Sequence, residues 1–369
     1  MKKKALVFIA SLLTIASCGG SEPFKVEPNE VKDITIHSEL VDAYFKQDKY
    51  DYSDLPSNPN PYARTDQGDN LPINITWSSN GGENTKYRLV FEESEQTLSY
   101  EVTGKSFDFY NYKLNTSYTM HIESGNYKSK EITFTTPSGF VRTVTIDGVS
   151  NFRDLGEGKK IKQGLIYRSM TFENNTISGQ SPEITEEGIK ELKNLGIKSE
   201  IDLRKDSERG EKAGTLEGIN YQFKPLFYGG QNILTYRGTQ EGISYDNPQT
   251  IKEILEFLSV KDNYPVDFHC VRGTDRTGCI AYIVKGLLGV EEEYLCKDFI
   301  FSNFYNIGSS VRLDSIEYTI NPAAETRYVN VIKHEEGDSL QEKIYNYLKN
   351  KLEMSTEKID SVINILKVN

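Results

Sequence analysis

Two residues of reactive type, Cys270 and Arg276, are separated by five residues in the stretch HCVRGTDRTG, residues 269–278. A short apolar run precedes this stretch, and an apolar helical pattern follows it. A turn that contains glycine and enters a helix directs successive backbone N–H groups at one point, where the helix dipole also favours anions. We therefore expect this loop to bind phosphate through Val271, Arg272, Gly273, Thr274, Asp275 and Arg276.

The polar side chains of the loop have predicted chemical tasks. The field of the loop lowers the pKa of a thiol at its start, so Cys270 is the candidate nucleophile. Arg276 can bind two oxygens of the transferred phosphoryl group. Asp275 can protonate the departing oxygen and then deprotonate the attacking water. Thr277 can donate a hydrogen bond to the sulfur when it leaves, and His269 is expected to orient the loop as a packed histidine.

The complete ten-residue sequence of the loop identifies a family far more specifically than a cysteine and an arginine at this spacing do, since that spacing often arises by chance. It resembles the signature of the protein-tyrosine phosphatase superfamily. With an aspartate before the arginine, the loop resembles that of an atypical bacterial family, which includes secreted tyrosine, dual-specificity and phosphoinositide phosphatases. Three further stretches follow the family's order: residues 151–156 (NFRDLG), 167–169 (YRS) and 201–208 (IDLRKDSE).

The resemblance covers residues 140–369 and implies a phosphoric monoester hydrolase of the tyrosine or dual-specificity type. It implies Asp275 as the general acid and requires no metal and no cofactor. The stretch 223–231, where a separate acid loop could lie, contains no carboxylate, which also favours Asp275.

The residue before that aspartate bears on the substrate. Members of the family that act on phosphoinositides often carry lysine there, whereas this chain has Thr274. A phosphotyrosine or other phosphoprotein is therefore the leading expectation, with a phosphoinositide or inositol phosphate as the alternative. Two other classes stay open: a non-catalytic protein that binds phosphorylated ligands, and a rhodanese-like sulfur transferase, which leaves the Asp275-Arg276-Thr277 sequence unexplained.

Five polar residues of the supporting motifs admit two interpretations, contact with substrate or support of the loop and sheet. Salt bridges and turn hydrogen bonds explain them at least as well as substrate contact does: Asn151, Arg153, Asp154, Arg204 and Glu208.

The rest of the chain shows two patterns. Apolar and polar residues alternate with period two from about residue 70 to 137, which is typical of short antiparallel strands. With Trp77 and Tyr118, residues 61–137 resemble a fibronectin type III or other immunoglobulin-like sandwich. Over residues 140–369 strands alternate with helices, which predicts an α/β phosphatase domain with a mainly parallel sheet flanked by helices. Helices are predicted at about 184–195, 248–259, 277–288, 291–304, 339–351 and 356–367, and strands at about 197–203, 219–226 and 265–269.

The N-terminus has the features of an export signal. Three lysines, an apolar run from Ala5 to Ala16 and small residues at its end predict a secretory signal over residues 1–17. The ending Ile15-Ala16-Ser17-Cys18 resembles a bacterial lipoprotein signal, which implies a lipid on Cys18 and a membrane-anchored periplasmic or cell-surface protein. Residues 18–60, rich in Ser, Pro, Asn, Asp and Glu, are expected to form a tether with a short helix near 39–45.

Charge and cysteine content exclude some functions. A formal net charge of -11 lacks the positive surface that broad nucleic-acid binding needs, so no nucleic-acid partner is expected. After Cys18 the cysteines are Cys270, Cys279 and Cys296, whose spacing does not suit a metal site with histidines. Cys279 and Cys296 fall on helical patterns and are expected to be core residues.

Overall fold

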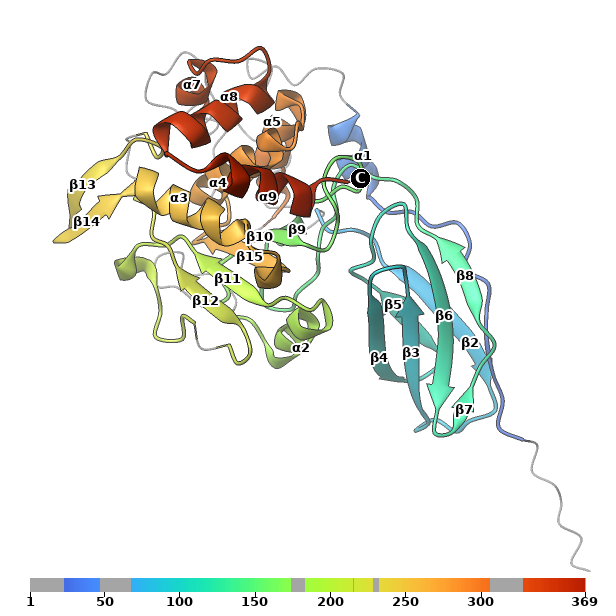
Figure 1. The fold of residues 1–369 in the computed structure, drawn as a ribbon. Coiled ribbons are helices and arrows are strands. Elements are labelled where there is room, and N and C mark those ends of the chain that lie inside the picture. Colours follow the sequence, from blue (N-terminus) through green and yellow to red (C-terminus); the bar gives the residue numbers. More distant parts are fainter. Residues whose placement is uncertain are drawn as a thin grey trace, which may run out of the picture.

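A computed structural model describes residues 23–46, 68–173, 183–214, 216–227, 232–305 and 328–368. They form an antiparallel β part and an α/β part that lie side by side (Figure 1). The predicted signal at 1–17, the predicted lipidation site Cys18 and residues 47–60 of the predicted tether lie outside the described residues. Within the described ranges, no helix combines the length and the apolar content needed to cross a bilayer.

The β part consists of antiparallel sheets around one hydrophobic core. In this core Trp77 is buried, and the rings of Phe91 and Phe109 stack with their centroids 4.0 Å apart. The strands expected from the alternating pattern are present, and a further strand over Thr97–Thr103 continues the same alternation with Leu98, Tyr100 and Val102. One sheet has the order β1 (Val26–Pro28), β2 (Ile73–Ser79) and β5 (Ser106–Phe109); the other has the order β4 (Thr97–Thr103), β3 (Lys86–Glu92), β6 (Ser117–Ser124) and β7 (Tyr127–Lys128), with β8 (Ile132–Thr135) also paired to β6.

The α/β part is built on a five-stranded sheet with the order β12-β11-β15-β10-β9. The first four of these strands are parallel to their neighbours, and the short edge strand is antiparallel, so the predicted mainly parallel sheet is confirmed. The strand bounds are β12 (Asn220–Phe223), β11 (Ser199–Asp202), β15 (Val266–Cys270), β10 (Ile166–Met170) and β9 (Arg153–Asp154). All five residues of β15 are buried in the middle of the sheet. Its carboxyl end is therefore the place where such sheets bind ligands.

Helices pack around this sheet at the positions that the apolar period predicts. They are α2 (Glu186–Asn194), α3 (Asn247–Leu258), α4 (Asp275–Leu287), α5 (Glu292–Phe301), α8 (Leu340–Asn346), which continues as a π-helical turn over Tyr347–Lys351, and α9 (Thr356–Leu366). The sequence did not predict α7 (Tyr328–Lys333) or the hairpin of β13 (Arg237–Gln240) and β14 (Ile243–Asp246). Nearly all residues of α4 are buried, so this helix crosses the core directly after the predicted phosphate loop.

The segment expected to be a tether packs against both parts over residues 23–46. β1 pairs with β2, and the predicted short helix is present as α1 (Glu39–Phe45). Val41, Tyr44 and Phe45 are buried in the core of the α/β part, and the Tyr44 hydroxyl donates to the Lys297 carbonyl at 2.8 Å. The average composition of the segment is polar, but these three side chains are enough to anchor it. This stretch therefore differs from the tether that we expected.

Arg142 connects the two parts through a buried ion pair. Its side chain is 1% exposed, and its Nη1 lies 2.6 Å from Oδ2 of Asp154. The same guanidinium donates to the carbonyl oxygens of Tyr112 at 2.9 Å and Asn111 at 2.6 Å, both from the β part. Because a buried cation needs full pairing, this contact fixes where the β part meets the five-stranded sheet.

A second buried cation lies between β15 and β11, beside the predicted loop. His269 is fully buried, and its Nε2 is 2.9 Å from Oε1 of Glu200. Burial disfavours the imidazolium, but the charge of Asp202 and the bond to Glu200 outweigh burial and raise the pKa of His269 to about 9. The ring therefore carries a positive charge at neutral pH and ties the central strand to its neighbour.

The raised pKa of His269 predicts a pH dependence of the free energy of unfolding. The folded chain binds the proton more tightly than the unfolded chain, whose histidine has its ordinary pKa of 6.5. The stabilisation is thus complete below pH 6.5 and is lost as the pH rises through 9. The loss amounts to about 3 kcal/mol, and urea unfolding at several pH values across this range measures it.

Two variants separate this effect from other titrations. His269→Gln is expected to be less stable at low pH and to lose the part of the pH dependence that His269 contributes. His334→Gln, which changes an exposed histidine, is the matched control and should keep the wild-type profile. The same pH profile in wild type and His269→Gln contradicts a charged His269.

Candidate active site

The loop between β15 and α4 curves around the N-terminus of the helix. Gly273 has a φ of 69°, and a Cβ atom there would lie 2.3 Å from the Ser169 carbonyl oxygen, so only glycine fits. The Thr274 hydroxyl turns to the Arg272 carbonyl, 3.4 Å away, instead of capping α4. The first N–H groups of α4 are thus left to an anion, which the helix dipole also attracts.

Cys270 ends β15 with its side chain 2% exposed. Burial by itself opposes ionisation of the thiol, but the positive charge of Arg276 and hydrogen bonds from Thr277 outweigh it. The pKa of Cys270 is therefore lowered, although Asp275 acts in the opposite direction. The Thr277 hydroxyl has no oxygen or nitrogen partner among the described residues, which leaves it to the sulfur. The site thus favours the thiolate, the reactive form of cysteine.

Arg276 is held in place by a carboxylate from the loop after β11. Its Nη1 donates to Oε2 of Glu208 at 2.5 Å and lies 3.4 Å from the Leu203 carbonyl oxygen. Glu208 ends the short 3-10 helix Asp206–Glu208 and also accepts from the Lys205 N–H at 2.9 Å, which fixes its carboxylate. The buried Nε of Arg276 has no partner in the part of the chain that the structure describes. A guanidinium held on one side with an open N–H on the other can bind an oxyanion.

Two of the supporting motifs, residues 151–156 and 167–169, hold the backbone of the loop through hydrogen bonds. Nη2 of Arg168 donates to the Gly273 carbonyl at 2.7 Å. Asn151 donates through Nδ2 to the Arg272 carbonyl at 2.9 Å, and it accepts a hydrogen bond from Arg153 at its own Oδ1. Both arginines are buried. These side chains therefore hold the backbone of the loop in place.

Asp298 on α5 joins the two buried arginines. Its Oδ1 accepts from Arg153 Nε at 3.0 Å, and its Oδ2 accepts from Arg168 Nη1 at 2.7 Å. Burial favours the neutral acid, but the charges of Arg153, Lys285 and Arg168 outweigh it and hold the pKa of Asp298 far below its usual range. Sequence reasoning missed this residue, because an aspartate within a helical pattern carries no signal of a buried ion pair.

The predicted site residues gather at the loop, with different exposures. Asp275 is the first residue of α4 and is half-buried, and its charge acts on both Cys270 and Arg276. Arg272 is half-buried, whereas Val271 and Thr274 are buried.

His269 supports the strand rather than the reacting group. Its ring faces Glu200 and packs against Phe172, with 5.2 Å between the ring centroids. Its Nδ1 is 3.4 Å from the Cys270 carbonyl oxygen. This is the packed, orienting histidine that the sequence predicts.

Other residues of the motifs lie away from the loop. Arg204 pairs with Asp202 at 2.7 Å, and Asp154 pairs with Arg142, so both are structural. Cys279 and Cys296 are buried and belong to no disulfide, and burial raises the pKa of both thiols, that of Cys296 to about 12, as expected of core residues. Residues 228–231 of the stretch without carboxylates lie outside the described residues.

Comparisons with known proteins bear on the α/β part. The tyrosine phosphatase family matches over residues 144–367. A Cupriavidus necator protein named as a candidate tyrosine-protein phosphatase is 24% identical over 190 residues, which cover 44% of this chain and 64% of the relative. The chain therefore spans somewhat less than two thirds of that relative's length.

Solved structures show a weaker likeness. The catalytic core of Siw14 is 16% identical, with 57% of this chain and 95% of that chain covered and a TM-score of 0.31. Pseudomonas aeruginosa TpbA is 16% identical, with 42% and 86% covered and a TM-score of 0.25. Scores this low carry no weight for the activity of this chain. The family match, in contrast, spans more than half of the chain and includes the loop with its supporting motifs. This chain belongs to the tyrosine phosphatase family.

Proposed function

We propose that this protein hydrolyses phosphomonoesters through a cysteinyl-phosphate intermediate. The observation that supports this best is the thiol of lowered pKa, Cys270, opposite Arg276 at the N-terminus of α4. A phosphate in the loop would accept hydrogen bonds from the helix N–H groups and from the open Nε–H of Arg276. Its phosphorus would then lie next to the nucleophile.

Two displacements at phosphorus complete the reaction. First the Cys270 thiolate attacks, the bond from phosphorus to the leaving oxygen breaks, and Asp275 gives that oxygen its proton. Then water attacks the cysteinyl phosphate, Asp275 takes a proton from the water, and the P–S bond breaks to release phosphate. Thr277 donates to the sulfur as it regains its charge, and Glu208 keeps Arg276 on the phosphoryl oxygens.

We propose a single phosphate on a protein, such as phosphotyrosine, as the substrate. Thr274 is buried and bonded to the Arg272 carbonyl, so its position adds no positive charge to the loop. Arg276 has the largest charge effect on the thiol and has a buried N–H without a partner among the described residues, while buried Arg168 is bonded to Asp298 and to the Gly273 carbonyl. A loop with one cation open to the ligand suits one phosphate better than a headgroup with several phosphates.

Cys270→Ser tests the chemistry. A serine hydroxyl is not ionised near neutral pH, so turnover of a phosphotyrosine peptide should fall by more than about 1,000-fold. Binding of inorganic phosphate should persist, because the N–H groups and Arg276 remain. Cys296→Ala, which changes a buried thiol on α5, is the control and should keep its turnover.

Turnover by Cys270→Ser at the wild-type rate refutes the covalent mechanism. Faster hydrolysis of a phosphatidylinositol phosphate than of the peptide by the wild-type protein refutes the substrate class but leaves the chemistry intact.

Glu208→Gln tests how Arg276 is positioned. The change keeps the shape of the side chain but removes the charged acceptor of Nη1. Such a hydrogen bond contributes about 1.5 to 3 kcal/mol, so kcat/KM should fall roughly 10- to 100-fold. The inhibition constant of inorganic phosphate should rise in parallel. Asp206→Asn alters an exposed ion pair with Arg209 on the same turn and should leave both quantities unchanged; equal effects of the two variants contradict the role of Glu208.

We further propose that the protein is an exported lipoprotein, on the evidence of residues 1–18. A lipid on Cys18 would hold it at a membrane surface of the periplasm or the cell exterior. We interpret the β part as a fibronectin type III-like module, since the Tyr118 hydroxyl accepts from the Lys113 N–H at 2.7 Å, as in the tyrosine corner of such sandwiches.

Cys18→Ala tests the anchor. The full chain should fractionate with membranes and be released by detergent, whereas Cys18→Ala should lose the lipid and move to the aqueous fraction. Ser21→Ala leaves the predicted lipoprotein signal intact and should behave as the wild type. Equal membrane fractions for wild type and Cys18→Ala rule out this anchor.

A further inference from the structure

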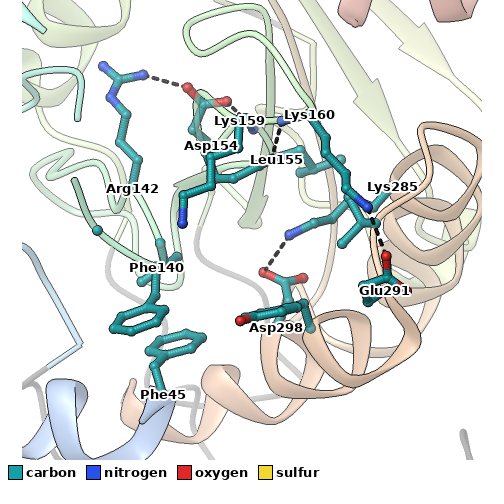
Figure 2. A pocket seen from close by; sticks show the side chains of 16 residues that line it. Phe45, Phe140, Arg142, Asp154, Leu155, Lys159, Lys160, Lys285, Glu291 and Asp298 are labelled. Atoms are coloured by element: carbon teal, nitrogen blue, oxygen red, sulfur yellow. Dashed lines mark hydrogen bonds and ion pairs between the residues drawn. The ribbon is translucent and has the colours of Figure 1, made fainter. Parts of the chain in front are cut away.

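A pocket lies near the end of α4 that is remote from the catalytic loop (Figure 2). Lys285, which lines it, follows Asp275 by ten residues, a rise of about 15 Å along the helix. None of the lining residues belongs to the loop 269–278. The pocket has a volume of about 160 Å³, similar to the ~150 Å³ cavity that holds one benzene ring. It is therefore a separate cavity with room for a ring-sized group.

Aromatic rings form one wall of the pocket. The rings of Phe45 on α1 and Phe140 are stacked, with centroids 5.3 Å apart and 4° between their planes. Leu155 and Val290 add apolar surface, and both are buried. A flat apolar group can pack against this wall, and burying it there is favourable.

Two ammonium groups at the pocket lack a close acid partner. Lys160 pairs with Glu291 at 3.0 Å. Lys159, in contrast, is exposed and has no ion pair or hydrogen bond among the described residues. Lys285 lies 3.7 Å from Oδ1 of Asp298, a long contact to an oxygen that Arg153 already occupies (Figure 2).

Positive charge is in excess around Asp298. Three cations, Arg153, Arg168 and Lys285, share this one carboxylate. Burial and, after it, the charge of Arg153 lower the pKa of Arg168 to about 10. An anion between Lys159 and Lys285 would relieve this crowding from the pocket side.

Four carboxylates line the pocket, those of Asp154, Glu157, Glu291 and Asp298, and the carboxylate of Glu157 can accept a further hydrogen bond. Glu157 lines it, and its Oε1 accepts from the Lys160 N–H at 2.6 Å. Its Oε2 is buried without a partner in the described part of the chain. A ligand with a hydroxyl or amine would satisfy this oxygen.

We propose that this pocket binds a small aromatic acid that carries a hydrogen-bond donor, and that its occupancy is linked to the catalytic loop through Asp298. The ring packs on Phe45 and Phe140, and the acid group lies between Lys159 and Lys285. When the acid group of the ligand pairs with Lys285, Oδ1 of Asp298 keeps Arg153 as its partner. Since Arg153 holds Asn151, and Asn151 holds the loop backbone, the ligand and a phosphate in the loop should favour each other.

Calorimetry on the full chain with 4-hydroxyphenylacetate as the probe tests the binding site. This probe should bind at least tenfold more tightly than acetate, which lacks the ring, or phenol, which lacks the charge. Lys159→Met should weaken its binding tenfold or more, and Lys198→Met, which changes an exposed lysine outside the pocket, should not. No binding to the wild type, or equal binding to Lys159→Met, overturns the site.

The linkage between the pocket and the loop rests on the proposed binding of phosphate by the loop. The variant Cys270→Ser allows phosphate binding to be measured without turnover. The affinity of this variant for inorganic phosphate should rise several-fold when the probe is saturating, and adding Lys159→Met should remove the gain. The same phosphate affinity with and without bound probe overturns the linkage. Failure of the proposed hydrolysis would appear separately, as wild-type protein that binds phosphate without turning over a phosphotyrosine peptide.

Discussion

Asp298 holds two buried guanidinium groups, Arg153 and Arg168, and these hold the backbone of the catalytic loop through Asn151 and Gly273. A loop that binds phosphate needs positive charge, but an unpaired buried cation is very costly. Asp298 accepts from both arginines and so partly balances their charge, while other N–H groups of the same side chains hold Asn151 and the Gly273 carbonyl. Losing one partner of such a buried pair costs about 3 to 5 kcal/mol. The shape of the loop therefore depends on a residue outside it.

The charges beside the loop are arranged so that they do not compete with the thiol. Successive side chains of a strand point to opposite faces, so His269 faces Glu200 while Cys270 faces the loop. The positive charge of His269 is balanced by Glu200 and Asp202. Arg276 and Thr277 lower that pKa instead. Two adjacent residues thus have separate electrostatic environments, one structural and one reactive.

Local sequence patterns predicted those elements whose structure depends on residues close to them in the chain. The strand, loop and helix around Cys270 follow from apolar periodicity and from glycine at a position where a Cβ atom would collide with the chain. The role of Asp298 depends on two arginines about 130 and 145 residues earlier in the chain, and no local pattern reveals such a pairing. The anchoring of α1 likewise depends on contacts of Tyr44 with residues near 300. The strands β13 and β14 have four residues each, and β13 contains no apolar residue, so their pattern is too short to mark a hairpin.

The N-terminal segments are part of the environment of the catalytic sheet rather than independent attachments. Arg142 pairs with Asp154, the residue that ends β9, and it also binds carbonyl oxygens of the β part. Asp154 in turn accepts from the N–H groups of Gly156 and Gly164 and thereby shapes the turn that carries Lys159. That turn and α1 line the same cavity as Asp298. A continuous set of contacts therefore runs from the β part through the lining of this cavity to Asp298 and the arginines that hold the loop.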